Sequence, residues 1–148
     1  MPKSLASSGY GATFFIGNET ASPIEYTAVA EIATINKKNY TITSIDATHL
    51  QSPDATEEMF PGLKKPGTIE LTGSFIGDAT QLQFDTLAAG QTVFPFKMTA
   101  PMQKSAKTAT VTGYCFVTDS EDGPYEANKK VDFKVILQVT GPTVTTIA

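Results

Sequence analysis

The sequence predicts a mainly β fold, an antiparallel β-sandwich or open barrel with one flanking α-helix. About six or seven segments alternate apolar and polar residues with a period of two, which is typical of strands buried on one face. A single segment among them breaks this rhythm and carries helix signals at both ends. The length of 148 residues suits one domain whose core needs neither disulfides nor metals.

The clearest strands cover residues 68–75, 108–118 and 131–140, where every second residue is apolar. Residues 26–35 and 40–48 are also strand-like and flank a polar turn, which predicts a hairpin. Residues 92–98 form a further short strand. We expect this strand at an edge or a bulge, because Pro95 has no backbone N–H to donate to a sheet.

The helical segment covers residues 79–89. Asp78 and Gln81 have the spacing of a capping box, and Gly90 suits the position just after the helix. Phe84 and Leu87 lie on one face, whereas Leu82 points to nearly the opposite side. A helix that is apolar on two sides is expected to have two packing partners.

The chain divides into three parts. Residues 1–22 are rich in Ser, Gly and Ala and are expected to form a flexible N-terminal arm. The β domain covers residues 23–141, and residues 142–148 are a short C-terminal tail. Within the domain, residues 44–67 form a long polar loop that still carries spaced apolar side chains, so we expect it to be an ordered arm that packs against a partner.

Composition excludes several classes of protein. The formal net charge of −4 argues against binding to nucleic acid by charge, which requires a basic surface. The only adjacent basic pairs are Lys37–Lys38, Lys64–Lys65 and Lys129–Lys130, which we interpret as solvated surface. One cysteine forms no intrachain disulfide, and no apolar run approaches the length of a signal peptide or a membrane span. These features favour folding in a reducing cytosol.

The sequence gives no positive indication of an enzyme, a metal site or a cofactor. His49 is the only histidine and is interpreted as a structural or surface residue. Cys115 lies on the apolar face of a strand, which predicts a buried, inert thiol. The acidic segment 119–123 lacks the ligand spacing of a calcium loop and is expected to be a solvated turn.

The stretch IDATHLQSPDATEEMFPGLKKPGTIELTGSF, beginning at Ile45, resembles the signature of the major tail tube proteins of long-tailed, non-contractile bacteriophages. The resemblance covers about residues 23–141 as an ordered series of motifs, none of which is diagnostic alone. It identifies a candidate assembly arm of Ile45, Asp46, Thr48, Leu50, Ser52, Pro53, Asp54, Phe60, Pro61, Gly62 and Leu63.

The resemblance implies a structural virion protein made in the cytoplasm of the bacterial host. It implies hexameric rings, stacked into a tail tube whose inner sheets join into a barrel, with tape-measure and tail-tip or terminator proteins as partners. Double-stranded DNA would pass through the lumen without specific binding, so the lumen should be neutral or acidic. The candidate lumen residues are Glu70, Thr72, Ser74, Thr108, Thr110, Thr112, Asp132 and Gln138. The sequence does not decide which of these strand faces lines the lumen.

Two alternatives remain open at this point. One is a monomeric ligand-binding β-sandwich module, although the absence of Trp weakens a carbohydrate-binding interpretation. The other is a related hexameric ring protein, either a tail terminator or the tube of a contractile injection machine. The architecture is shared, so fold alone does not separate these ring proteins.

Overall fold

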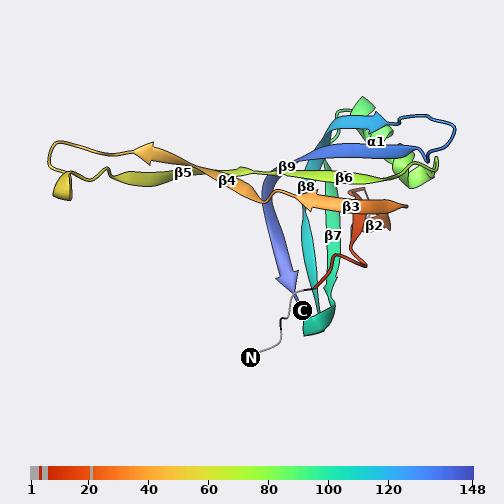
Figure 1. Ribbon diagram of the computed structural model, residues 1–148, viewed down its shortest axis with the longest axis horizontal. Helices are drawn as coiled ribbons and strands as arrows, with labels where there is room; N and C mark the ends of the chain where they lie inside the picture. Colours follow the sequence, from red (N-terminus) through yellow and green to blue (C-terminus); the bar gives the residue numbers. More distant parts are fainter. Residues whose placement is uncertain (1–3, 5–6, 21) are drawn as a thin grey trace.

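The computed structural model describes residue 4 and residues 7–20 and 22–148, and it is built mainly from antiparallel strands. Seven strands form one sheet in the order β2-β1-β7-β8-β9-β6-β3, and two strands form a separate hairpin, β4-β5 (Figure 1). The sheet strands are β1 (Thr13–Asn18), β2 (Glu25–Ala28), β3 (Ile32–Lys37), β6 (Thr68–Ser74), β7 (Phe94–Met102), β8 (Lys107–Asp122) and β9 (Asp132–Ile147). The hairpin strands are β4 (Tyr40–Asp46) and β5 (Met59–Pro66), and α1 is Ala79–Ala89. This confirms the predicted mainly β class with one helix, although the sheet does not close into a barrel.

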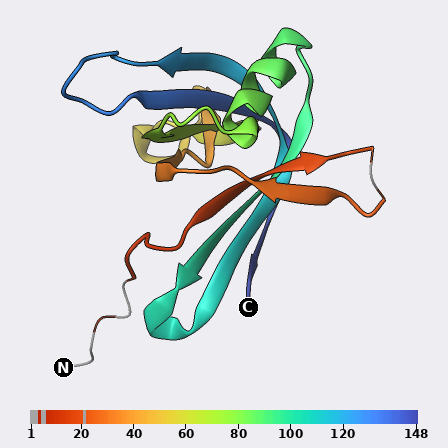
Figure 2. The same cartoon turned by 90° about the vertical axis from the view of Figure 1, so that its right-hand side faces the viewer.

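The sheet bends into two layers because β8 and β9, of 16 residues each, run through both (Figures 1 and 2). The β8–β9 register shifts between Thr112 and Tyr114, where Gly141 of β9 has a φ of +75°. We call the first layer the arm layer: it holds β3, β6, residues 132–140 of β9 and the second half of β8. The second is the hairpin layer: it holds β1, β2, β7, residues 107–113 of β8 and residues 141–147 of β9.

The core lies between the two layers and beneath α1. Phe14 of β1 stacks on Phe96 of β7 at 5.8 Å between ring centroids and packs against Phe84 of α1 at 6.4 Å. The alternation predicted for β6 and β9 is confirmed by a set of buried side chains: Ile69, Leu71, Phe133, Val135, Leu137 and Val139. Burial of this apolar surface is the main stabilising contribution to the fold.

Helix α1 begins and ends where the sequence predicts, but its caps differ from the prediction. Asp78 Oδ1 accepts a hydrogen bond from the Thr80 backbone N–H at 2.9 Å, as an N-cap should. Gln81 does not complete the capping box, because its buried side chain bonds elsewhere. At the other end Gly90 is helical, and the residue in the left-handed conformation is Gln91.

The prediction of a flexible arm over residues 1–22 is wrong for Thr13–Asn18, which is strand β1 between β2 and β7. Phe14 and Ile16 are buried in the core, and that burial fixes the segment in spite of its Gly- and Ser-rich flanks. The part of the prediction that concerns residues 1–3, 5–6 and 21 lies outside the described residues. The predicted C-terminal tail is likewise wrong, since β9 continues to Ile147 in register with β8.

Two strand predictions also need correction. Residues 26–35 split into β2 and β3, and β3 pairs with β6 rather than with residues 40–48. Strand β7 is an interior strand, not an edge, because it pairs with both β1 and β8. Pro95 is tolerated there because the register with β1 ends at Phe96, and the neighbouring Gly17 has no side chain to meet the proline ring.

Candidate assembly surface

The segment expected to be a long loop is a β-hairpin that projects from the body of the molecule (Figure 1). Strand β4 pairs with β5 from Tyr40↔Pro66 at the base to Asp46↔Met59 near the tip. All seven residues of β4 are exposed. A hairpin with no layer beneath it is at best marginally stable in water. We call this hairpin, residues 40–66, the arm.

Both faces of the arm carry exposed apolar side chains. Ile45 and Phe60 are paired across one face. The other face carries Tyr40, Ile42, Met59 and Pro61, whose positions follow from the same register. Leu63 occupies a bulge beside Gly62 and is 91 % exposed. An arm that is apolar on two sides has two surfaces to cover, and in the described part of the chain these side chains remain exposed on both.

The tip of the arm is held by a network of short hydrogen bonds. Asp46 Oδ1 accepts from the Thr48 N–H at 2.8 Å, and these hydrogen bonds from Thr48 lower the pKa of the Asp46 carboxyl. The Glu58 N–H donates to Thr48 Oγ1 at 2.9 Å, which closes the two strands. The Glu58 carboxylate accepts from Ser52 Oγ at 2.8 Å and contacts His49 Nε2 at 3.1 Å.

His49 therefore belongs to the hydrogen-bond network of the tip. Its Nδ1 accepts a hydrogen bond from the Gln51 N–H at 3.1 Å, and its Nε2 faces the Glu58 carboxylate. The network orders the loop and leaves Leu50 pointing into solvent with its side chain fully exposed.

The structure brings all of the predicted arm residues into this one hairpin. Ile45 and Asp46 end β4; Thr48, Leu50 and Ser52 form the tip; Pro53 and Asp54 begin the short 3₁₀ turn Pro53–Ala55; and Phe60, Pro61, Gly62 and Leu63 lie in β5. Asp54 adopts a φ of +57°, a conformation that Asp tolerates better than most residues.

The candidate lumen residues fall into two groups on different layers. Glu70, Thr72, Ser74, Asp132 and Gln138 lie on the face of the arm layer that points away from the core, because they alternate with buried neighbours. Thr108, Thr110 and Thr112 lie on the corresponding face of the hairpin layer, opposite Pro101, Thr99 and Lys97 of β7. The two groups therefore lie on different layers of the molecule.

The arm-layer group is largely engaged in contacts of its own. Glu70 forms an ion pair with Lys134 at 3.5 Å, and Asp132 forms one with Lys130 at 3.0 Å. Gln138 Nε2 donates toward the carbonyl oxygens of Pro66 and Gly67, at 3.3 and 3.1 Å, so it anchors the base of the arm. The threonines of the hairpin layer have neutral hydroxyl side chains instead.

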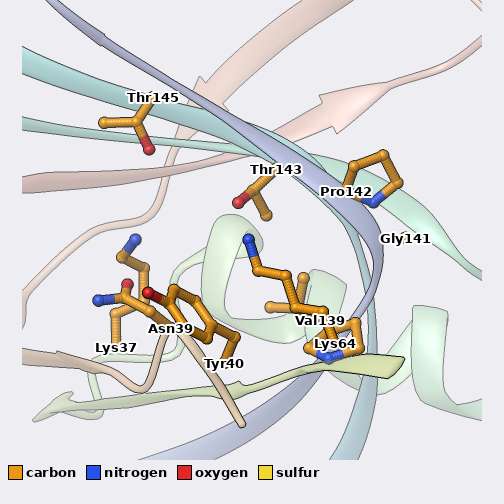
Figure 3. A pocket seen from close by; sticks show the side chains of 10 residues that line it. Lys37, Asn39, Tyr40, Lys64, Val139, Gly141, Pro142, Thr143 and Thr145 are labelled. Atoms are coloured by element: carbon orange, nitrogen blue, oxygen red, sulfur yellow. The ribbon is translucent and has the colours of Figure 1, made fainter. Parts of the chain in front are cut away.

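A cleft of about 820 Å³ lies between the base of the arm and the C-terminal half of β9 (Figure 3). Its walls are Lys37, Asn39, Tyr40, Lys64, Pro66, Val139, Gly141, Pro142, Thr143 and Thr145. The Lys37 and Lys64 side chains both extend into it, and the Lys64 ammonium lies 4.3 Å from the centre of the Tyr40 ring. We call this the base cleft. Sequence reasoning missed it, since its residues come from three distant segments.

The groups that sequence analysis considered for metal binding or catalysis have the following places in the structure. No group of three or more His, Cys, Asp or Glu side chains in the described part of the chain is placed to hold a metal ion. Cys115 is buried, and burial raises the pKa of its thiol far above the ordinary range. Within the described ranges no helix is long and apolar enough to cross a membrane.

No protein-family model matches the sequence, and no curated protein does. Solved structures do match. A chain from the tail of an empty gene transfer agent particle with C6 symmetry has a TM-score of 0.74 at 16 % identity, covering 95 % of this chain and 99 % of that one. The SPP1 tail tube has a TM-score of 0.64 at 14 % identity, covering 90 % of this chain and 75 % of that one. The cap that terminates the anti-feeding prophage tube has a TM-score of 0.70 at 11 % identity, covering 100 % of this chain and 95 % of that one.

These likenesses define the fold as that of phage tail tubes and of related injection-system tubes and caps. They confirm the fold that the arm motif and the strand pattern predict. The structurally similar chains belong to tails, tubes and terminating caps.

Proposed function

We propose that this protein is a structural subunit that assembles into hexameric rings, stacked into a phage tail tube through which DNA is ejected. The observation that carries the proposal is the arm, a hairpin that projects from the body with exposed apolar side chains on both faces. Exposed apolar surface of this kind marks an interaction site. Two faces support contacts with two partners, a neighbour in the ring and a subunit of the next ring.

The free edges of the hairpin layer support closure into a ring. On the side away from β8, residues 141–147 of β9 pair with no strand in the described part of the chain. The opposite edge of the layer is formed by β2, which has only four residues. Unpaired edges favour pairing with another chain, and head-to-tail pairing that closes by rotation produces a ring without edges.

If the hairpin layers form the inner barrel, Thr108, Thr110 and Thr112 line the lumen and the Glu70 group faces outward. The threonine hydroxyls are neutral and suit a channel that passes DNA without binding its phosphates. Lys97, opposite Thr112, is a cation on the same face, and its ammonium lies over the rings of Phe15 and Tyr26. The tape-measure, tail-tip and terminator proteins would then be the partners along the axis and at the ends of a virion tail. The protein would be made in the host cytoplasm before assembly.

The first test is negative-stain electron microscopy of the purified protein over a series of concentrations, with sizing by light scattering. We expect hollow tubes of stacked six-fold rings that lengthen with concentration. A protein that stays monomeric at every concentration, even with its tail-tip complex added, would overturn the proposal. Single rings that never stack would favour a terminator or cap, which have similar TM-scores.

The second test decides which layer faces the lumen. Thr110→Cys and Ser74→Cys place one thiol on each outward face, and the native thiol is buried. Assembled tubes are treated with a maleimide carried on a long polyethylene glycol chain, too bulky to diffuse far into a narrow channel. We expect slow labelling at position 110 and fast labelling at position 74, with equal rates in the monomers. The reverse order would place the arm layer at the lumen.

A further inference from the structure

We propose that the tip of each arm docks into the base cleft of another copy, held by opposite charges at the two ends of the hairpin. This inference rests on the proposed assembly and names the contact that would drive it. The occupant of the cleft is therefore a second copy of this chain, through residues 46–58.

The two ends of the arm carry opposite charges. Residues 46–58 contain Asp46, Asp54, Glu57 and Glu58, and no Lys or Arg. The base carries Lys37 and Lys38 at the end of β3 and Lys64 and Lys65 in β5, with no acidic residue among residues 36–45 or 59–69. One lysine from each of two pairs that look like isolated surface turns in the sequence, Lys37 and Lys64, thus lines the same cleft.

Most of these charges form no ion pair with a described residue, although Glu58 contacts His49 and Lys64 lies over the Tyr40 ring. None of the four lysines forms an ion pair with a described residue, and neither do Asp54 and Glu57. Lys37 is partly buried, and this desolvation lowers the pKa of its ammonium. A cation that is partly desolvated and unpaired is stabilised by any carboxylate that enters the cleft.

The cleft also offers apolar walls to the tip. Tyr40, Pro66, Val139 and Pro142 line it, and Leu50 is the most exposed apolar side chain on the tip. A hydrophobic anchor surrounded by charged contacts is the usual composition of an interface centre.

The contact cannot form within one copy. Tyr40 and Asp46 are separated by about 20 Å of extended strand, at about 3.3 Å per residue. The paired register of β4 and β5 prevents the arm from folding back on its own base. The tip therefore binds the base cleft of a second copy. Because the tip and the cleft are different surfaces, the contact is heterologous and repeats head to tail from copy to copy.

The test uses charge reversal at each end. The tip variant carries Glu57→Lys with Asp54→Asn, since Asn also tolerates a positive φ. The base variant carries Lys37→Glu and Lys64→Glu. The formal charge of the tip falls from −4 to −1 in the first variant, and that of the four base lysine positions falls from +4 to 0 in the second. Each variant alone loses most of the attraction and should form tubes at a rate at least about tenfold below the native protein at low salt. A matched control, Glu126→Lys with Lys129→Glu, reverses an exposed pair in another loop and should assemble normally.

Mixing the two variants is the decisive step of the experiment. In the mixture the cation introduced by Glu57→Lys on one variant can meet the carboxylates introduced by Lys37→Glu and Lys64→Glu on the other, and the native tip meets the native base. We expect equimolar mixing to restore tubes in which the two variants alternate. Rescue by mixing shows in addition that both variants are folded.

A covalent measurement gives an independent readout. Leu50→Cys and Thr143→Cys, carried on separate copies, should crosslink with a short bismaleimide only in assembled tubes, while the buried Cys115 does not react. Thr13→Cys in place of Thr143→Cys is the negative control, since Thr13 lies on β1, away from the cleft.

The outcomes separate the two proposals. Suppose that the native protein forms tubes. If the variants then assemble normally, or if mixing them does not restore assembly, the docking contact is overturned and the proposed tube function stands. A native protein that forms neither rings nor tubes would overturn both. If the base variant fails to assemble while the tip variant assembles normally, the anion that binds the cleft is not the tip, and the docking contact is overturned.

Discussion

Cys115 illustrates how one buried residue makes stability depend on pH. The thiol lies on the core face of β8 opposite Val139, and burial raises its pKa. In the unfolded chain the thiol ionises above about pH 8.5, whereas in the fold it stays protonated. Ionisation therefore favours the unfolded state, and stability is lost as the pH rises.

We predict that the free energy of unfolding falls by up to about 1.4 kcal/mol per pH unit from this group above pH 8.5. Urea unfolding of native protein and of Cys115→Ala, measured between pH 7 and 10, isolates the effect. The difference between the two proteins should shrink with pH. A difference that stays constant would contradict a buried neutral thiol.

Gln81 joins α1 to two other elements. It is buried, accepts from the Ile76 N–H at 3.0 Å, and donates to the carbonyl oxygens of Ala30 at 3.0 Å and Ser74 at 2.8 Å. The side chain therefore satisfies backbone groups at the end of β6 and in the β2–β3 connection. Unmade hydrogen bonds at buried positions cost more than made ones contribute.

We predict that Gln81→Leu destabilises the fold by about 3 kcal/mol, because a side chain of similar size leaves three backbone groups unpaired. The midpoint of urea unfolding measures this loss. Gln83→Leu on the same helix is the matched control, and its effect should be small. Equal losses in the two variants would show that the hydrogen bonds of Gln81 contribute little.

The elements that the sequence predicts well are those with local signals. Alternation of apolar residues locates β6, β8 and β9, and the Asp78 cap locates α1, because each pattern is set by the residues within the element. Strand β1 was missed since its apolar run Phe14–Ile16 is short and its flanks are rich in Gly and Ser. Only its place between β2 and β7 makes it a strand.

The same division applies to the assembly surface. The arm residues are contiguous in sequence, so a motif was enough to collect them. The base cleft was not predictable, because Lys37, Lys64 and Thr143 meet only after β9 bends beside the arm. Partner strands are also non-local, which is why residues 26–35 were paired with the wrong neighbour.

At the scale of the whole molecule, the tip of the arm lies apart from the core. No residue between 47 and 58 belongs to the hydrophobic core. We predict that replacing residues 47–58 with Asn-Gly, a two-residue turn that joins Asp46 to Met59, leaves the melting temperature within about 3 °C of the native value. The same protein should form no tubes by electron microscopy, because it has lost the tip.

Circular dichroism and sizing of the shortened protein serve as the control for folding. Tubes of normal length from this variant would show that assembly needs only the body and the strands of the arm. A shortened protein that unfolds would instead show that the tip stabilises the monomer.

The way the arm is rooted has a mechanical consequence. Strand β5 runs on through Pro66 and Gly67 into β6, which is hydrogen-bonded along its length to β9 (Figure 1). Tension applied along the arm therefore loads the β6–β9 ladder in shear, so that its hydrogen bonds resist together rather than breaking one after another. Because β9 continues through the bend into the second layer, that load reaches the far edge of the subunit. A row of such subunits would transmit a tensile force along its axis through continuous strands.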